Sequence, residues 1–531
     1  MPAPSTTKEF DISAHVPACI GKFNRIEAAS AQGCWVTDTD GRRYLDLSAG
    51  IGVLSTGHCH PRVVAAAQAQ VATMILAQQN CIFTTEVHKN LVQKLLSIMP
   101  CEEAAKDVAN ATDTTTGEAS KDVVLEKITR APSPLSSFFF CNSGAEAIDN
   151  AIKVVRMATG KQNVIVLTGG YHGRTIGSMA LTSSKTTYRR CFGPLMAGVH
   201  YLEFDPENGK SKVVPPLHSL TDDMQSSAST ESTTTSDSGA PHAHQEQDPG
   251  FTNKNTPGAL KSGEDEQLAA RLISRFEMLL TQQTDALETA AVLLEPVLGE
   301  GGILRVPHTF LRYLRKRCDE LGIMLVLDEV QCGMGRTGTW WACEQANVCP
   351  DVLVFAKGIA SGFPLAGLAL RKEKIVDKLL PNALGGTYGG QAVCLAAASA
   401  TIDAIRDEGM LGNACERGGE IATGLRALES KLILGIRQYG LFIAVDLAPD
   451  LVTPQEIIRC AAAGCSAGNQ SENSKTSNDS DAKSGDSGRL IMIPGGRNGL
   501  RITPPLCISK DEVSYFLDHF RRLLQVVEKS K

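Results

Sequence analysis

Short apolar runs alternate with segments of helical periodicity along most of this chain, and this alternation restricts the folds that it can adopt. The run at 136–141 (SSFFFC) precedes a segment in which Ile148 and Ile152 recur at helical spacing, and further apolar runs occupy 323–327 and 352–355. Apolar runs of this length are typical of strands that are buried on both faces. The pattern predicts an α/β fold with a mainly parallel central sheet, whose ligands bind beyond the carboxyl ends of the strands.

Three stretches depart from this globular pattern. They lie near 101–122, 207–265 and 465–488 and are rich in Ser, Thr, Asp, Gly or Asn. Sequences of this composition cannot bury enough apolar surface to form a core. Because they lie between segments that do have apolar periodicity, we expect them to be surface insertions.

Charge and composition limit the partners of the chain. Its 531 residues carry a net charge of −6 without a basic cluster, so binding to nucleic acid or to an anionic membrane is not expected. No apolar run is long enough to cross a bilayer. The 16 cysteines are scattered, and the N-terminus lacks an apolar signal segment, which favours a reducing compartment. We expect small-molecule substrates and a cytoplasmic location, with the mitochondrion left open.

The end of the run at 136–141 has the features of a phosphate site. Ser143, Gly144 and Ala145 stand between this strand candidate and the helical segment. The free backbone N–H groups and the dipole of a helix N-terminus attract phosphate, and a glycine allows close approach. By itself the pattern also fits an ordinary strand-to-helix turn.

Two further strand candidates end in ionisable residues. Asp328 follows the run at 323–327, and Lys357 follows the run at 352–355. A buried carboxylate needs a partner, which could be a protonated pyridine nitrogen or a structural cation. A lysine at the end of a buried strand is desolvated and becomes nucleophilic enough to form an imine.

Six motifs in order give the chain a specific resemblance. It resembles the class III, fold-type I pyridoxal-phosphate aminotransferases from about residue 16 to about residue 525, through SGAEA at 143–147, GYHGRT at 170–175, EPVLGEGG at 295–302, DEVQ at 328–331, AKG at 356–358 and GGTYGG at 385–390. The resemblance implies a large cofactor-binding domain at 62–398. It also implies a smaller α+β domain built from both chain ends, 1–61 and 399–531.

The resemblance assigns roles around a pyridoxal 5′-phosphate ring. Lys357 would hold the cofactor as a Schiff base and then act as the general base and acid of the proton transfer. Asp328 would keep the pyridine nitrogen protonated, and Gln331 would donate a hydrogen bond to the ring hydroxyl. Tyr171 and Val330 would cover the two faces of the ring.

The phosphate site that the resemblance implies spans two subunits. Ser143, Gly144 and Ala145 would bind the phosphate together with Thr387 of the other subunit, so a homodimer with shared active sites is expected. Two more residues are expected at the cofactor, His172 and Glu295. We expect no metal ion, because the adjacent ligand candidates His58, Cys59 and His60 would point in different directions.

Within the family the chain looks most like the 4-aminobutyrate aminotransferases, on AGIGVLSTGHCHP at 49–61, YHGRT at 171–175 and LRITPPL at 500–506. In such enzymes Ile51 would line the substrate pocket, and Arg174 would bind the distal carboxylate of the ω-amino acid. Arg501 would bind the α-carboxylate of 2-oxoglutarate or glutamate. Glu300 would pair with Arg501 while the bound substrate lacks that carboxylate, which avoids an unpaired buried charge.

The implied reaction converts 4-aminobutyrate and 2-oxoglutarate into succinate semialdehyde and glutamate. Three alternatives stay open at this point. The amino donor could be ornithine, N-acetylornithine, β-alanine, or alanine with glyoxylate, and the same fold also carries aminomutases and decarboxylases. Leu298 stands where the family usually has Gln, which puts details of the pocket in doubt. The G-x-G-x-x-G string at 333–338 lacks the helix and acidic residue of a dinucleotide site, so we reject a dehydrogenase.

Overall fold

The computed structural model describes residues 15–101, 132–206, 262–464 and 488–531, except residues 18, 22, 25, 77 and 79–81. The insertions expected near 101–122, 207–265 and 465–488 lie outside the described residues apart from their ends. At the end of the second, helix α7 begins at Ser262.

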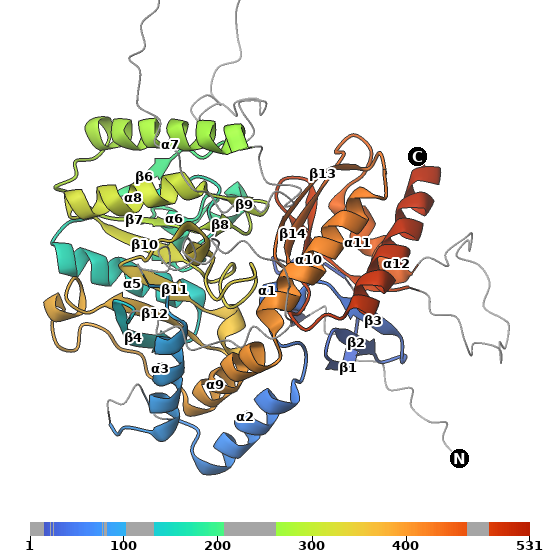
Figure 1. Cartoon of the computed structure of the whole chain (residues 1–531), viewed down its shortest axis with the longest axis horizontal. Helices are drawn as coiled ribbons and strands as arrows, with labels where there is room; N and C mark the ends of the chain where they lie inside the picture. The colour runs from blue at the N-terminus through green and yellow to red at the C-terminus, as the bar shows by residue number, and fades with distance from the viewer. Residues whose placement is uncertain are drawn as a thin grey trace, which may run out of the picture.

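A seven-stranded sheet forms the centre of the larger part of the molecule (Figure 1). The strand order is β4-β12-β11-β10-β7-β5-β6, and every neighbouring pair is parallel except the two pairs that include β12. The predicted α/β fold with a mainly parallel sheet is therefore confirmed. Its strands are β4 (Leu135–Cys141), β5 (Asn163–Leu167), β6 (Val199–Leu202), β7 (Thr289–Leu294), β10 (Met324–Asp328), β11 (Val352–Phe355) and β12 (Ala366–Arg371).

Helices cover both faces of this sheet. Successive side chains of each strand point to opposite sides, and both sets are apolar and pack against helices. Val164 and Val166 of β5 pack in the same apolar cluster as α5, whereas Ile165 and Leu167 pack in the cluster that contains α7 and α8. This arrangement explains why the strands read as continuous apolar runs. The main helices of this part are α2 (Pro61–Thr73), α3 (Glu86–Ile98), α5 (Gly144–Thr159), α7 (Ser262–Gln282), α8 (His308–Leu321) and α9 (Ala392–Asp407).

The two chain ends meet in a second region, on the right of Figure 1. There β15 pairs in parallel with β3, so residues near 490 continue a sheet that begins near residue 28. The predicted domain boundaries fall at the start of α2 and inside α9, and the division itself stays a prediction. The elements of this region are β1 (Ala28–Gln32), β2 (Trp35–Asp38), β3 (Arg43–Asp46), β13 (Ile433–Tyr439), β14 (Phe442–Leu447), β15 (Leu490–Ile491), β16 (Ile493–Gly495), β17 (Gly499–Ile502), α10 (Met410–Arg426), α11 (Pro454–Ala463) and α12 (Lys510–Lys529).

Short elements lie in the connections between these helices and strands. They are α1 (Ala49–Gly52), α6 (Ile176–Leu181), β8 (Val297–Leu298), β9 (Leu304–Arg305) and the 3₁₀ turns η3 (Thr186–Tyr188), η4 (Ala342–Ala346), η5 (Lys357–Ala360) and η6 (Val376–Lys378).

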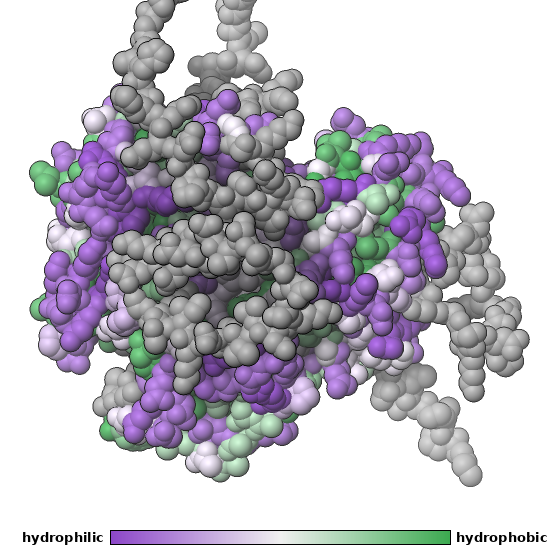
Figure 2. All heavy atoms as spheres, viewed as in Figure 1, coloured by the Kyte–Doolittle hydropathy of each residue, from purple (hydrophilic) through white to green (hydrophobic). Residues whose placement is uncertain are grey.

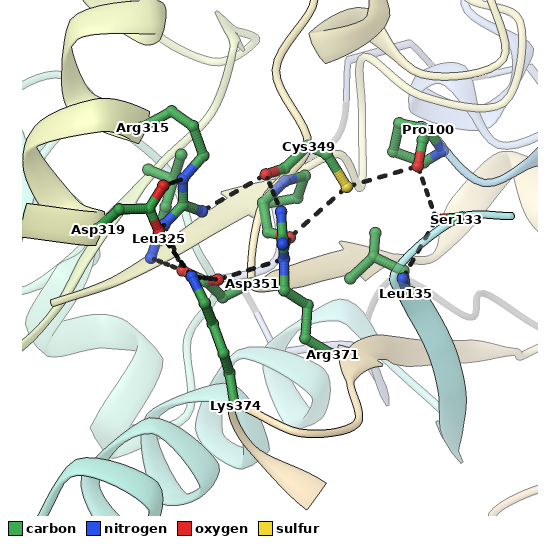
Figure 3. A network of polar contacts seen from close by, with 11 residues as sticks. Pro100, Ser133, Leu135, Arg315, Asp319, Leu325, Cys349, Asp351, Arg371 and Lys374 are labelled. Carbon is green, nitrogen blue, oxygen red and sulfur yellow. Dashed lines mark hydrogen bonds and ion pairs between the residues drawn. The ribbon is translucent and has the colours of Figure 1, made fainter. Parts of the chain in front are cut away.

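A buried ionic cluster ties the opposite, amino ends of β10 and β11 to α8 and β12. Asp351 is fully buried, and the cationic groups of Arg315, Arg371 and Lys374 lie 2.9, 3.3 and 3.2 Å from its carboxylate oxygens. The backbone N–H of Leu325 also donates to it, at 2.8 Å. Figure 3 shows these side chains converging on Asp351. Several cations around one buried carboxylate offset its desolvation cost.

The surface of the described residues is mostly hydrophilic in the view of Figure 2, consistent with burial of the apolar runs. No helix in the described parts of the chain has both the length and the hydrophobicity needed to span a bilayer.

Candidate active site

Lys357 occupies the expected position just beyond the end of β11. Its backbone has a φ of 45°, a left-handed conformation that is rare for residues with a side chain and that concentrates at functional sites. The side chain lines a cavity of about 460 Å³ beyond the carboxyl ends of β4, β10 and β11. Burial lowers the pKa of Lys357, and the charge of Arg501 lowers it further. Both effects favour the neutral amine, which is the nucleophilic form.

Asp328 reaches the same cavity from the end of β10 and has two partners. Its Oδ2 lies 2.8 Å from Nδ1 of His172, and its Oδ1 accepts a hydrogen bond from the backbone N–H of Val330 at 3.1 Å. Asp328 and His172 are both 3% exposed, so these contacts are shielded from water. The buried carboxyl group is thereby fixed at the edge of the cavity.

The N-terminus of α5 forms another wall of the cavity. Ser143, Gly144 and Ala145 all line it, and Ser143 caps the helix by accepting a hydrogen bond from the N–H of Glu146 at 3.2 Å. The first N–H groups of a helix have no partner within it, so they are available to an anion. A side chain at Gly144 would come within 3.2 Å of Val330, which explains the glycine.

Tyr171, Glu295 and Gln331, three more residues predicted to lie at the cofactor, also line the cavity. Glu295 accepts hydrogen bonds from the backbone N–H groups of Tyr171 and Gly299, both at 2.9 Å, so it supports the segment that carries Tyr171. Burial raises the pKa of Glu295 to about 7. Gln331 packs so closely against Gly299 that a Cβ there would lie 1.7 Å from its Oε1.

These groups fit pyridoxal phosphate. The side-chain Nε2 of Gln331 is buried without a hydrogen-bond partner among the described residues, and so is Nε2 of His172. A buried orphan donor is costly unless a ligand satisfies it. One cavity thus combines a lysine, a buried carboxylate, an unsatisfied amide and a helix N-terminus, which suits a pyridine ring that carries a carbonyl, a hydroxyl and a phosphate.

Comparison with known proteins agrees with this chemistry. The family described as aminotransferase class-III matches residues 21–228 and 226–524 of the chain. This chain belongs to the class-III aminotransferases. It is therefore an enzyme that transfers amino groups, and the prediction of pyridoxal phosphate as its cofactor is confirmed.

Individual relatives of this aminotransferase support the same assignment. A 5-aminovalerate aminotransferase from Pseudomonas putida is 32% identical over 438 residues, which cover 82% of each chain. A 4-aminobutyrate aminotransferase from Escherichia coli is also 32% identical, over 439 residues and 82% of each chain. Among solved structures, an omega-transaminase from Thermomicrobium roseum has a TM-score of 0.70 at 23% identity, covering 95% of this chain and 93% of that one. This last likeness shows the fold.

Arg174, which the sequence predicts to bind substrate, lines the same cavity and is exposed. Its Nε donates to the hydroxyl of Tyr171 at 3.2 Å, and its guanidinium carbon lies 4.4 Å from the centre of the Tyr188 ring. The rings of Tyr171 and Tyr188 pack edge to face, with centroids 5.3 Å apart. Two aromatic side chains therefore orient the arginine.

Glu300 and Arg501 form an ion pair beside this cavity, although the lining residues do not include them. The two side chains are joined by a hydrogen bond of 2.5 Å between an Arg501 nitrogen and Glu300 Oε2. Burial alone would raise the pKa of Glu300, but Arg501, Lys185 and Tyr188 outweigh it and lower the pKa to about 2. The carboxylate is therefore ionised throughout the neutral range.

Two predicted residues lie away from the cavity in the single chain. Ile51 is 40% exposed, with a φ of 70°, and does not line the cavity. Thr387 is exposed in the segment 385–390 and does not line it either. The structure thus brings the other predicted cofactor residues and Arg174 together, places the Glu300–Arg501 pair alongside, and leaves Ile51 and Thr387 outside.

Sequence reasoning missed several residues at this site. Lys185 and Tyr188 contact Glu300, while Val53 and the loop 362–365 line the cavity. Lys185 and Tyr188 belong to a polar connection without periodicity, so no local pattern distinguishes them from solvated residues.

Proposed function

We propose that this aminotransferase takes the amino group from an ω-amino acid, with 4-aminobutyrate as the first candidate, and passes it to 2-oxoglutarate. The products are succinate semialdehyde and glutamate. The observation that carries the proposal is the ion pair of Glu300 with Arg501 beside a cavity that contains a second arginine, Arg174. A donor without an α-carboxylate leaves Arg501 no anion, and Glu300 supplies one.

The cofactor, when bound, supplies an electron-withdrawing ring that acidifies the hydrogen on the amino-bearing carbon of the substrate. Lys357 would accept that proton on its amine, whose lowered pKa favours the neutral form. Asp328, oriented by His172, would keep the pyridine nitrogen protonated. Gln331 would donate its unpaired N–H to the ring hydroxyl. Ser143, Gly144 and Ala145 would hold the phosphate, and Tyr171 and Val330 would cover the ring.

The two arginines have separate tasks in this proposal. Arg174 binds the carboxylate at the end of the ω-amino acid, for which the paired donors of a guanidinium are well suited. Arg501 binds the α-carboxylate of 2-oxoglutarate or glutamate after Glu300 has released it. The same cavity can then serve both half-reactions with one cofactor.

A second donor, 5-aminovalerate, deserves the same test, because the relative from Pseudomonas putida carries that name. It differs from 4-aminobutyrate by one methylene, which changes only the distance between the amino group and the carboxylate. Binding energies that differ by one methylene discriminate weakly, by about 1–3 kcal/mol.

We also propose a homodimer in which Thr387 of one subunit completes the phosphate site of the other. The exposure of Thr387 and of its neighbour Tyr388, which is 64% exposed in the single chain, supports this arrangement. Sedimentation of the loaded enzyme and loss of cofactor affinity in Thr387→Ala would test it. A cytoplasmic location stays a prediction.

The deciding experiment is a panel of single half-reactions. The loaded enzyme is mixed with 4-aminobutyrate, 5-aminovalerate, ornithine, N-acetylornithine, β-alanine or alanine, and the absorbance of the bound cofactor is followed. We expect the fastest conversion with 4-aminobutyrate or 5-aminovalerate, and we expect Arg174→Gln to raise the KM for these donors far more than the KM for 2-oxoglutarate. Faster conversion of alanine, or equal effects of Arg174→Gln on both substrates, would contradict the proposal.

A further inference from the structure

The two carboxylate oxygens of Glu300 are held by different partners. Oε2 accepts from Arg501 at 2.5 Å, whereas Oε1 accepts from the ammonium of Lys185 and from the hydroxyl of Tyr188, both at 2.8 Å. Lys185 precedes the turn η3 and Tyr188 is its last residue, so both are separate in sequence from Glu300 and from Arg501. One end of the carboxylate is therefore anchored independently of Arg501.

This second anchor matters because Glu300 is largely buried. Its side chain is 14% exposed, that of Arg501 is 5% exposed, and that of Lys185 is 37% exposed. A buried carboxylate that loses its only cation pays a large desolvation penalty. With Lys185 and Tyr188 on Oε1, Glu300 can release Arg501 through Oε2 and still keep one cation and one neutral donor.

We propose that Lys185 and Tyr188 are positioning residues that hold Glu300 when it releases Arg501, and that they thereby set how readily the site accepts a substrate with a second carboxylate. The inference rests on the proposed function, because it takes Arg501 as the group that binds the α-carboxylate. Without these anchors, Glu300 stays on Arg501 and the second carboxylate has to compete with it.

Tyr188 makes a second contact that can be separated from the first. Its ring lies under Arg174, 4.4 Å from the guanidinium carbon, while its hydroxyl donates to Glu300. The ring therefore supports the binding of the first carboxylate, and the hydroxyl supports release of the arginine that binds the second. Removing the hydroxyl alone should weaken the binding of dicarboxylates only. Removing the whole ring should weaken the binding of monocarboxylates as well.

Binding of two unreactive acids to the cofactor-loaded enzyme tests this without catalysis. Pentanoate has one carboxylate and leaves the Glu300–Arg501 pair closed, whereas glutarate has two and requires the pair to open. By calorimetry, we expect Tyr188→Phe and Lys185→Met each to weaken glutarate binding about tenfold and to change pentanoate binding less than about twofold. Tyr188→Leu should weaken the binding of both acids. Lys372→Met, at an exposed lysine outside the site, is the matched control and should change neither.

The outcomes separate the inference from the proposed function. If wild-type enzyme binds both acids but Tyr188→Phe and Lys185→Met leave the ratio of the two Kd values unchanged, the inference is wrong and the proposed function stands. If Arg174→Gln does not weaken the binding of pentanoate, or Arg501→Gln does not weaken the binding of glutarate, the proposed function is wrong, whatever the Lys185 and Tyr188 variants do. A kinetic readout agrees with the inference only if both anchor variants raise the KM for glutamate and spare the KM for the ω-amino donor.

Discussion

His172 Nδ1 lies 2.8 Å from Asp328 Oδ2, and this contact joins residues that are 156 positions apart in the chain. A ring N–H that donates here fixes the orientation of the carboxylate. His172→Ala removes this donor, so that the backbone N–H of Val330 is the remaining donor to Asp328 among the described residues. We expect cofactor affinity to fall roughly tenfold to a hundredfold, since hydrogen bonds to charged groups contribute about 1.5–3 kcal/mol.

Titration of the apoenzyme with pyridoxal phosphate, followed by absorbance, measures this effect. His172→Asn is the matched control, because its amide can donate from a similar position. Equal affinities of wild type and His172→Ala would show that the contact does not support the cofactor.

Gly299 leaves no room for a side chain beside Gln331. A Cβ at this position would lie 1.7 Å from Gln331 Oε1, so Gly299→Ala must displace the amide from its place in the cavity. We expect about tenfold weaker cofactor binding, similar to the loss in Gln331→Ala. The double variant should be no worse than either single variant, because both remove the same interaction. Additive losses would mean that Gly299 acts on the site by another route.

The charge of Arg501 contributes to the lowered pKa of Lys357. Arg501→Gln removes this charge, so we expect the pKa of Lys357 to rise. Only the neutral amine attacks the cofactor, and the pH profile of cofactor loading should therefore shift to higher pH. Stopped-flow loading between pH 6 and 10 measures the shift, and Arg174→Gln should leave the profile in place. An unshifted profile in Arg501→Gln would contradict the prediction.

Glu329 makes the stability of the enzyme depend on pH. Burial raises its pKa from 4.5 to about 7, although the backbone N–H groups of Ala342 and Cys343 donate to it. A raised pKa means that folding favours the neutral carboxyl, so this contribution is fully present below pH 4.5 and is lost as the pH rises through 7. Relative to Glu329→Gln, the wild type should lose about 2–3 kcal/mol of unfolding free energy over this interval.

Chemical denaturation at several pH values gives this difference. Glu329→Gln also loses a hydrogen-bond acceptor, but the resulting change in unfolding free energy does not depend on pH. Glu295, whose pKa is also raised to about 7, is present in both proteins and cancels in the comparison. The prediction fails if the difference in unfolding free energy between the two proteins stays constant from pH 4.5 to 8.

Asp351 is expected to contribute to the stability of the fold without affecting substrate binding. Asp351→Asn leaves Arg315, Arg371 and Lys374 without their shared buried carboxylate, which should cost about 3–5 kcal/mol. Asp518→Asn removes an exposed ion pair with Arg521 and should cost less than about 1 kcal/mol. Denaturation midpoints compare the two variants, while KM values should stay unchanged in both. A small loss in Asp351→Asn would show that the cluster of Figure 3 contributes little.

The sequence by itself determined several of the buried strands and which residues lie at their ends. Buried strands are apolar on both faces and end in polar residues at the ligand edge, so β4, β10 and β11 and the residues Ser143, Asp328 and Lys357 could be located from local patterns. Short motifs at these strand ends were sufficient to indicate the family and pyridoxal phosphate.

Only the tertiary structure decided which side chains meet across the chain. His172 reaches Asp328 from beyond a different strand, and Lys185 and Tyr188 reach Glu300 from a connection that has no periodicity of its own. The structure also revealed that Ile51 and Thr387 lie outside the cavity of the single chain. Local sequence records the conformation and burial of each segment, but contacts between distant segments depend on the path of the connecting loops and on how the layers pack.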